Sequence, residues 1–163
     1  MRVYPRTSIV PFEPHHLDGV VDLSLKAWSP VFVGIESALT PALYRQMHPD
    51  WRADQRAAVT AACDELSVWV AIEGDRPAGF VAVKLHEAAK MGEIYMIAVD
   101  PDHQRKGIAR ALADIAVEHM RQAGMTLVMI ETGGDPGHAP ARAAYEALGY
   151  HPFPSVRYFK SVA

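Results

Sequence analysis

Cysteine is nearly missing from this chain, since Cys63 is the single cysteine among 163 residues. One cysteine cannot form an internal disulfide, and no cysteine–histidine spacing typical of a metal site occurs. Long apolar runs are missing as well, because no segment approaches the ~20 residues that a membrane helix needs. Residues 1–5 precede no long apolar region, which is unlike a signal peptide. We therefore expect a cytoplasmic protein that uses no metal and has no membrane partner.

The chain also lacks an excess of positive charge. It has 16 Lys and Arg residues against 19 Asp and Glu residues, for a formal net charge of −3. This balance excludes a strongly basic nucleic-acid-binding protein, so we expect no nucleic acid as a partner. Internal repeats, low-complexity tracts and interdomain linkers are missing too, which predicts a single domain over residues 1–163, of a size that can bury a proper core.

What is present is a pattern of apolar runs and turns that predicts an α+β fold. Ser29-Pro30 is expected to end the first helix, because proline lacks the N–H that a helix interior requires. Thr40-Pro41 is expected to begin the second helix, since threonine is a good N-cap and proline suits the first helical position. The expected strands cover residues 7–11, 67–73, 78–85, 91–99, 125–131, 150–153 and 156–160. The expected helices cover residues 17–28, 41–48, 52–64, 108 to just before 124, and 140–148.

Two of the expected strands are placed further by their composition. The run from Met125 to Glu131 is apolar almost throughout, which predicts a buried strand in a central position. A helix connects it to the strand of residues 93–99, so these two strands are expected to be parallel.

The segment that joins the strand of residues 93–99 to the helix beginning at residue 108 has features of an anion-binding site. Asp100-Pro101 ends the strand, and a helix N-terminus follows, with its unpaired N–H groups and partial positive charge. Gly107 and Ala109 are small enough to let a ligand approach the backbone, and cationic side chains stand nearby. A diphosphate suits such a place. An ordinary turn with solvated basic residues is the alternative on these grounds alone. The cationic residues are Arg105, Lys106 and Arg110.

The same segment matches a known motif. It contains neither G-x-x-x-x-G-K-[ST] nor G-x-G-x-x-G, so the common nucleotide-binding motifs do not apply. It does match [RQ]-x-x-G-x-[GA] from Gln104 to Ala109, after a strand that ends in Val99-Asp100-Pro101. This resembles the acetyl-CoA loop of the GCN5-related N-acetyltransferase (GNAT) superfamily. The resemblance implies acetyl-CoA as co-substrate, contacted by Ile97, Ala98, Val99, Gln104, Arg105, Lys106, Gly107, Ile108 and Ala109.

A second stretch, residues 141–150, resembles the superfamily's A-x-x-x-Y-E-x-x-G-[FY] segment. The resemblance implies that Tyr145 donates a proton to the departing thiolate of coenzyme A, which a phenol beside a sulfur can do. The alternative is that Tyr145 packs on the sheet with its hydroxyl bound to backbone. His138 stands where the family usually has asparagine, seven residues before this tyrosine. His138 and Arg142 complete the expected cofactor-binding residues.

Acetyl transfer to an amine also needs a base, because a lysine-like amine with a pKa near 10.4 is mostly protonated at neutral pH. Glu93, in E-I-x-x-x-A-V, resembles the base glutamate of the histone-acetylating branch; a solvated residue at a strand start is the alternative. His86 and Glu87 are further candidates. The backbone N–H groups of residues 97–99 are expected to polarise the thioester carbonyl. Direct attack is expected, since no Ser or Cys nucleophile triad is evident.

The resemblance also implies an architecture and a reaction. We expect a mixed, mainly antiparallel sheet of six or seven strands flanked by about four helices, with a splayed parallel pair at its centre. We expect an acetyl-CoA-dependent N-acetyltransferase for a primary amine of a small molecule, in a chain that can form a homodimer. An N-acetyltransferase of protein termini or lysines and a non-catalytic acyl-CoA sensor are the alternatives. Four aromatic residues in the irregular segment either pack in the core or line an acceptor pocket: Trp28, Phe32, Tyr44 and Trp51.

Overall fold

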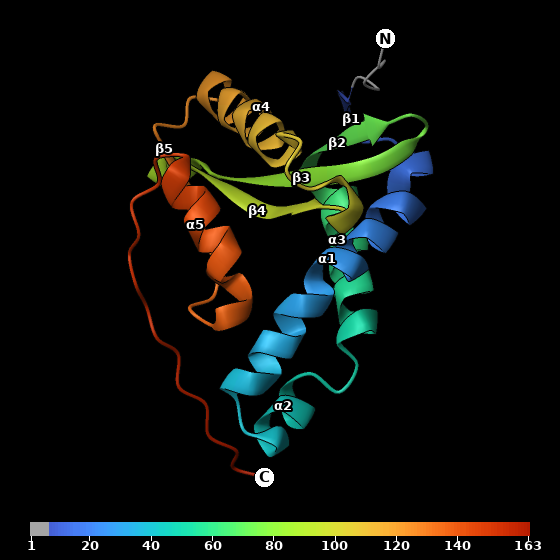
Figure 1. Ribbon diagram of the computed structural model, residues 1–163. Coiled ribbons are helices and arrows are strands. Elements are labelled where there is room, and N and C mark those ends of the chain that lie inside the picture. Colours follow the sequence, from blue (N-terminus) through green and yellow to red (C-terminus); the bar gives the residue numbers. More distant parts are fainter. Residues whose placement is uncertain (1–6) are drawn as a thin grey trace. The chain divides into compact units, whose positions relative to one another are not determined.

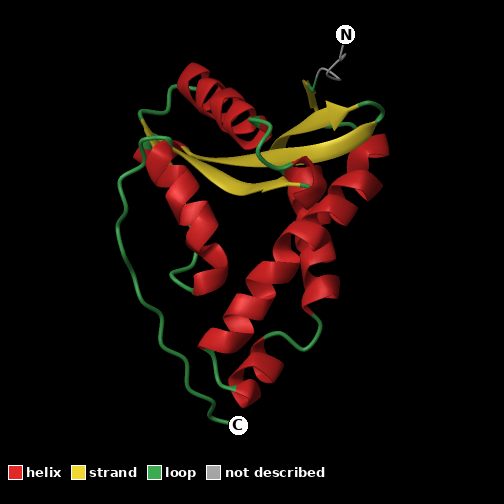
Figure 2. Cartoon of the chain, viewed as in Figure 1, coloured by secondary structure: helices red, strands yellow, loops and turns green. Residues whose placement is uncertain are grey.

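The computed structural model describes residues 7–163, and these form two compact units. The first unit combines the chain up to Ala27 with Gln55–Glu131, and the second combines Trp28–Asp54 with Thr132–Ala163. Figures 1 and 2 show the elements of both units. None of the helices in residues 7–163 has the combination of length and apolar character that crossing a membrane requires.

The first unit is built around one five-stranded sheet in the order β1-β2-β3-β4-β5. Neighbouring strands from β1 to β4 run antiparallel, and β4 and β5 run parallel. This confirms the predicted α+β class and the mixed, mainly antiparallel sheet. The strands are β1 (Ser8–Pro11), β2 (Ser67–Glu73), β3 (Arg76–His86), β4 (Met91–Val99) and β5 (Leu127–Ile130).

Three sequence-based expectations about this sheet are wrong. The sheet has five strands in place of six or seven, and residues 150–153 and 156–160 are not strands. The parallel pair lies at one end of the strand order, so β5 borders only β4 and its Leu127 side chain is 59% exposed. β-branched and aromatic residues form a strand only where a neighbouring strand pairs with them. Residues 150–160 have the composition of strands but pair with no strand of the sheet.

One face of the sheet is covered by α4 (Ile108–Gln122), which packs on β2, β3 and β4. Its buried side chains recur at helical spacing, which places one face of the helix on the sheet. Gly92 allows this helix to come close, because a Cβ at that position would lie 2.4 Å from the Met120 sulfur. The buried side chains of α4 are Ile108, Leu112, Ala113, Ala116 and Met120.

Figure 1 shows α3 (Trp51–Glu65) on the face opposite α4, together with the first half of α1 (Leu17–Ala38). These helices supply Val20, Leu23 and Val59, all at most 1% exposed, to the core of the first unit. Phe80 in β3 is fully buried there as well. The two helix layers therefore leave the sheet with an apolar interior along most of β2 and β3.

The prediction that Ser29-Pro30 ends the first helix is wrong, because α1 continues through Pro30 to Ala38. Proline removes one backbone hydrogen bond and crowds the preceding turn, at a cost of about 3 kcal/mol in a helix interior. The helix continues nonetheless, and Val31 and Ile35 beyond the proline are partly buried. Side-chain packing after the proline outweighs the local preference of the dipeptide.

The second unit contains α2 (Pro41–Met47) and α5 (Ala139–Ala147). Thr40 caps α2 as predicted, since its hydroxyl accepts a hydrogen bond from the Leu43 N–H at 3.3 Å. Phe32 stacks on Trp51 with ring centroids 4.4 Å apart, and the Arg52 guanidinium lies 4.4 Å from the centroid of the same tryptophan. These aromatic side chains therefore pack against one another. For Phe32 and Trp51 this favours a packing role over the lining of an acceptor pocket.

Candidate functional site

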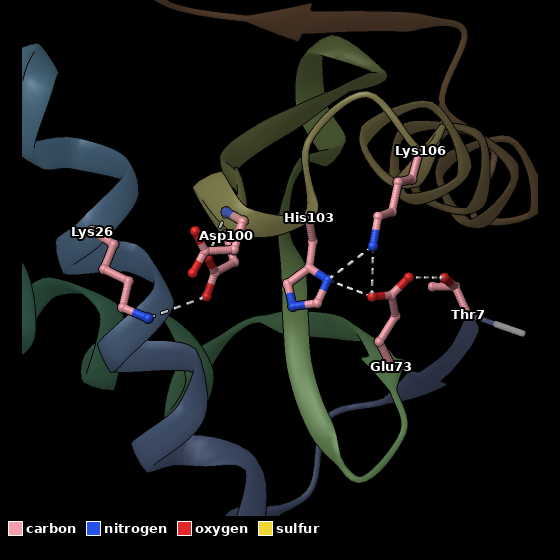
Figure 3. Close-up of polar contacts among 7 residues, drawn as sticks. Thr7, Lys26, Glu73, Asp100, His103 and Lys106 are labelled. Atoms are coloured by element: carbon pink, nitrogen blue, oxygen red, sulfur yellow. Dashed lines mark hydrogen bonds and ion pairs between the residues drawn. The ribbon is translucent and has the colours of Figure 1, made fainter. Parts of the chain in front are cut away.

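The connection from β4 to α4 is anchored at Asp100. Its carboxylate accepts a hydrogen bond from the Asp102 N–H at 2.9 Å and lies 3.5 Å from the Lys26 ammonium (Figure 3). The Asp100 N–H donates to the Ala78 carbonyl at 2.8 Å, which holds the end of β4 against β3. Asp100 thereby starts the short 3-10 helix Pro101–His103 and directs the chain toward α4.

The N-terminus of α4 is open to a ligand. Gly107 occupies the N-cap with a left-handed φ of +79°, and no side chain caps the helix. A Cβ at Gly107 would meet no atom within 4 Å, and the first turn of α4 carries no acidic residue. The first N–H groups of a helix have no partner inside it, so those of α4 are available to a ligand. Backbone donors, a glycine and the helix dipole together fit an anionic group such as a diphosphate.

Lys106, which the sequence predicts on the cofactor, is paired with a carboxylate in this structure. Its ammonium lies 3.3 Å from Glu73 Oε2, and the His103 ring contacts the same oxygen (Figure 3). The Thr7 hydroxyl donates to the other oxygen, Oε1, at 3.1 Å. Burial alone would raise the pKa of Glu73, but the hydrogen bonds from Thr7 and Lys106 and the nearby positive charges lower it.

Glu73 and His103 therefore help to hold the β4–α4 loop in place, and the sequence did not predict this role for either residue. Glu73 ends β2, more than 25 residues before the loop, and no local pattern connects the two segments. Only the sheet brings the end of β2 beside the start of α4, which packs on β2.

The second half of β4 is open along the edge that β5 leaves. The parallel ladder ends at Ile94 and Ile130, whereas β4 continues to Val99. The register against β3 shifts between Ala82 and Val83, so Tyr95 is an extra residue that forms a β-bulge. From Tyr95 to Val99, backbone groups on that edge have no β5 partner. This stretch includes Ile97, Ala98 and Val99, as the predicted splay requires.

Glu93 lies just before the bulge, on the sheet face opposite α4. This follows from strand alternation, because Gly92 faces Met120 of α4 and successive side chains point to opposite faces. His86 Nε2 lies 2.8 Å from Glu93 Oε1. The Lys84 ammonium lies 5.7 Å from the Tyr95 ring centroid beside this pair. The Glu93 side chain is 16% exposed and the His86 side chain 36%, so both can be reached from solvent.

In the second unit, His138 and Arg142 hold the loop that precedes α5. Arg142 Nη1 donates to the carbonyl oxygens of Gly133 at 2.6 Å and Asp135 at 2.8 Å. His138 Nδ1 lies 2.5 Å from Asp135 Oδ1. Both predicted cofactor-binding side chains are thus engaged within their own loop.

Tyr145 lies on α5 in the second unit, whereas Glu93 and the β4–α4 loop lie in the first. Burial raises the pKa of the Tyr145 phenol, and Tyr150 adds to the shift. The two tyrosine rings meet edge to face, with centroids 6.2 Å apart. The phenol is therefore protonated at neutral pH, as a proton donor must be.

Comparison with known proteins adds a decisive observation. Residues 35–150 match the sequence profile of the Acetyltransferase (GNAT) family. The chain belongs to this family. A mycothiol acetyltransferase of Kocuria rhizophila is 36% identical over 80 residues, which cover 47% of this chain and 26% of that protein. The chain thus spans about a quarter of the length of that relative.

Solved structures agree with the GNAT fold. The aminoglycoside N-acetyltransferase AAC(6')-Iy, in complex with a CoA-containing bisubstrate analogue, matches with a TM-score of 0.67 and 15% identity, over 97% of this chain and 99% of that one. The ribosomal-protein-S18-alanine N-acetyltransferase of Escherichia coli matches with a TM-score of 0.61 and 20% identity, over 88% and 77%. At these identities the likeness shows the fold alone.

Within this GNAT chain, the residues predicted from sequence fall into two sets. Gln104, Arg105 and Lys106 are exposed in the loop before Gly107. Ile108 is the first residue of α4, and its side chain is buried. Glu93 and the open stretch of β4 lie in the same unit as this loop. His138, Arg142 and Tyr145 form the second set. Across residues 7–163, no group of three or more His, Cys, Asp or Glu side chains is arranged to hold a metal ion.

Proposed function

We propose that the whole chain acts as a single N-acetyltransferase domain, which moves an acetyl group from acetyl-CoA to a primary amine of a small molecule. The observation that carries this proposal is that β4 has no β5 partner beyond Ile94 and leads through a short loop to the open N-terminus of α4 at Gly107. An open strand edge and a helix N-terminus in sequence suit a ligand with an amide-bearing arm and a diphosphate.

The pantetheine arm of coenzyme A has the chemistry to pair with the open edge of β4. Its amides can bond to the backbone groups of residues 95–99 in place of the missing strand. The diphosphate would bind the first N–H groups of α4, with Arg105 beside it. Lys106 can join only when a phosphate competes with Glu73 for its ammonium.

An acceptor ammonium loses two protons from its nitrogen in this reaction, and the leaving thiolate gains one. Glu93 takes a proton from the acceptor ammonium, and the amine lone pair then attacks the thioester carbonyl. The C–N bond forms, and the C–S bond breaks as the tetrahedral adduct collapses. Tyr145 protonates the leaving thiolate, and the second proton lost by the nitrogen restores the phenol. N–H groups of residues 97–99 stabilise the negative charge on the carbonyl oxygen.

A small amine is the first candidate acceptor, with support from a sequence relative. The mycothiol acetyltransferase of Kocuria rhizophila shares 36% identity with the matched segment, above the level of the solved structures cited. A protein terminal or lysine amine is the second candidate, because the family resemblance does not specify the acceptor amine. A non-catalytic acyl-CoA sensor is the third, and Glu93 and Tyr145 argue against it.

The decisive experiment measures thiol release from acetyl-CoA with a panel of aminoglycosides, amino sugars, polyamines, amino acids and peptides that begin with alanine. We expect release that depends on a small amine, with the acetylated product identified by mass spectrometry. The Glu93→Gln variant serves as control and should lower kcat by about 100-fold or more, which is the range for loss of a general base. Acetyl-CoA binding without amine-dependent release from any acceptor would favour the sensor.

A further inference from the structure

The contact between His86 and Glu93 joins the end of β3 to the beginning of β4. Their backbones are neighbours across the antiparallel ladder, where Lys84 pairs with Glu93 and His86 pairs with Met91. The histidine Nε2 reaches back along the same face to Glu93 Oε1 at 2.8 Å. A hairpin of this kind sets the spacing of the two side chains independently of any ligand.

The chemistry of the two groups decides which atom carries the hydrogen. An ionised carboxylate can only accept hydrogen bonds, so the histidine Nε2 must donate. Neutral His86 is therefore the tautomer with its proton on Nε2 and a lone pair on Nδ1. Among residues 7–163, no hydrogen bond engages the other carboxylate oxygen of Glu93, Oε2.

We propose that His86 is a positioning residue for the base: its Nε2–H holds Glu93 Oε1, and Oε2 is thereby presented to the acceptor ammonium. This inference rests on the proposed function, because it assigns a partner to the base of that reaction. The proton moves from the ammonium nitrogen to Oε2, while Oε1 remains bound to His86. A carboxylate held at one oxygen loses less freedom when it meets the substrate, which lowers the barrier to proton transfer.

The other polar residues that the structure describes near Glu93 do not contact its carboxylate. Lys84 shares the face, but its ammonium lies over the Tyr95 ring, 5.7 Å from the ring centroid. Glu87 follows His86 and begins the 3-10 helix Glu87–Ala89, where it is exposed. His86 is the group that contacts the Glu93 carboxylate in the described part of the chain.

Two replacements of His86 separate orientation from packing. His86→Gln keeps an N–H donor of similar reach, whereas His86→Leu keeps the bulk and removes the donor. We expect His86→Leu to lower kcat by about tenfold, with the KM for acetyl-CoA unchanged, and His86→Gln to stay within about threefold of the unsubstituted protein. In a Glu93→Gln background, His86→Leu should have no further effect on kcat, because the two residues act as a unit.

Equal losses in His86→Gln and His86→Leu, or an unchanged kcat in His86→Leu, would overturn the assignment. So would a loss in His86→Leu that persists beside Glu93→Gln. Full activity of Glu93→Gln alone would instead refute the proposed base itself.

A second measurement does not depend on turnover. Nitrogen chemical shifts of the His86 ring, assigned by comparison with His86→Gln, report the tautomer of neutral histidine. We expect the proton on Nε2 in the unsubstituted protein and a mixture of tautomers in Glu93→Ala. A proton on Nδ1 in the unsubstituted protein would contradict the proposal, whether or not an acceptor amine has been found.

Discussion

Burial holds the Cys63 thiol in its protonated form, because removal from water raises its pKa to about 11. A thiol needs to lose its proton to react, so Cys63 should be inert at pH 8 while the chain is folded. We expect DTNB to label no thiol in the native protein and one thiol per chain in denaturant. Rapid labelling of the native protein would show that this part of α3 opens readily.

The Tyr145 phenol keeps its proton throughout the neutral range, since burial raises its pKa above the usual value of about 10. Loss of activity through ionisation of Tyr145 should therefore begin only at a pH above that value. Tyr145→Phe should lower kcat by about 10- to 100-fold with little change in the KM for acetyl-CoA. Tyr158→Phe is the matched control, because that side chain is 92% exposed. An undiminished kcat in Tyr145→Phe would remove the residue from the acid role.

At the scale of elements, the N-terminus of α4 depends on Gly107. Gly107 and Gly74 both have left-handed φ angles, +79° and +65°, with open space where a Cβ would be. Replacement of either by glutamate should destabilise the fold similarly, by about 1 to 2 kcal/mol. Only Gly107→Glu should also weaken acetyl-CoA binding, by about tenfold or more, because its carboxylate meets the diphosphate at the helix terminus.

Calorimetric titration with acetyl-CoA distinguishes the two glycine variants. Equal affinities in Gly107→Glu and Gly74→Glu would contradict the assignment of the diphosphate to the β4–α4 loop. Equal thermal midpoints would show that any loss of affinity comes from the site and not from unfolding.

Glu73 links the end of β2 to the same loop, and its depressed pKa makes this link sensitive to acid. A carboxyl whose pKa is lower in the folded chain stabilises it above the unfolded pKa of about 4.3, and this contribution is lost as the pH falls through the folded value. Glu73→Gln should therefore lower the free energy of unfolding at pH 7 more than at pH 3, as measured with urea. Glu118→Gln is the control, because an exposed ion pair such as Glu118–Arg121 contributes little to stability.

The glutamine variant at position 73 would contradict this account if its loss of stability were the same at both pH values. The carboxylate would then contribute through packing or neutral hydrogen bonds alone.

At the scale of the whole molecule, the last residues differ from the rest. The chain from residue 150 onward forms no helix or strand, and Phe153 and Tyr158 are 93% and 92% exposed. Backbone without helix or sheet hydrogen bonds enters a protease site most readily. Limited digestion with chymotrypsin, followed by mass spectrometry, should therefore cut first within residues 150–163. A first cut inside Gln55–Glu131 would show that the sheet unit opens more easily than this segment.

Most elements of the molecule follow from local signals in the sequence. Thr40-Pro41 starts α2, and Gly149 adopts a left-handed φ of +93° just after α5. The backbone conformations that these residues prefer do not depend on distant partners. The apolar spacing of α4 and the glycine before it also predict that helix and its open N-terminus. Such features depend on residues within one turn of each other.

The strand count and the polar pairs depend on segments far apart in the sequence. β5 is an edge strand because no later segment pairs with it in this structure, and α1 passes Pro30 because packing beyond the proline outweighs a broken hydrogen bond. Glu73 contacts Lys106, which is 33 residues further along the chain, and the spacing of residues along a helix or strand cannot predict a contact at that separation.

The acetyl-CoA motif, the class of fold and the candidate base can all be predicted from the sequence, because each depends on short runs of residues. Three features depend on the folded chain: β4 has no β5 partner beyond Ile94, Glu73 binds Lys106 in the loop, and His86 contacts Glu93. The physical reason is that sheet pairing places residues of different strands within hydrogen-bond reach, and register is set by the packing of the whole sheet.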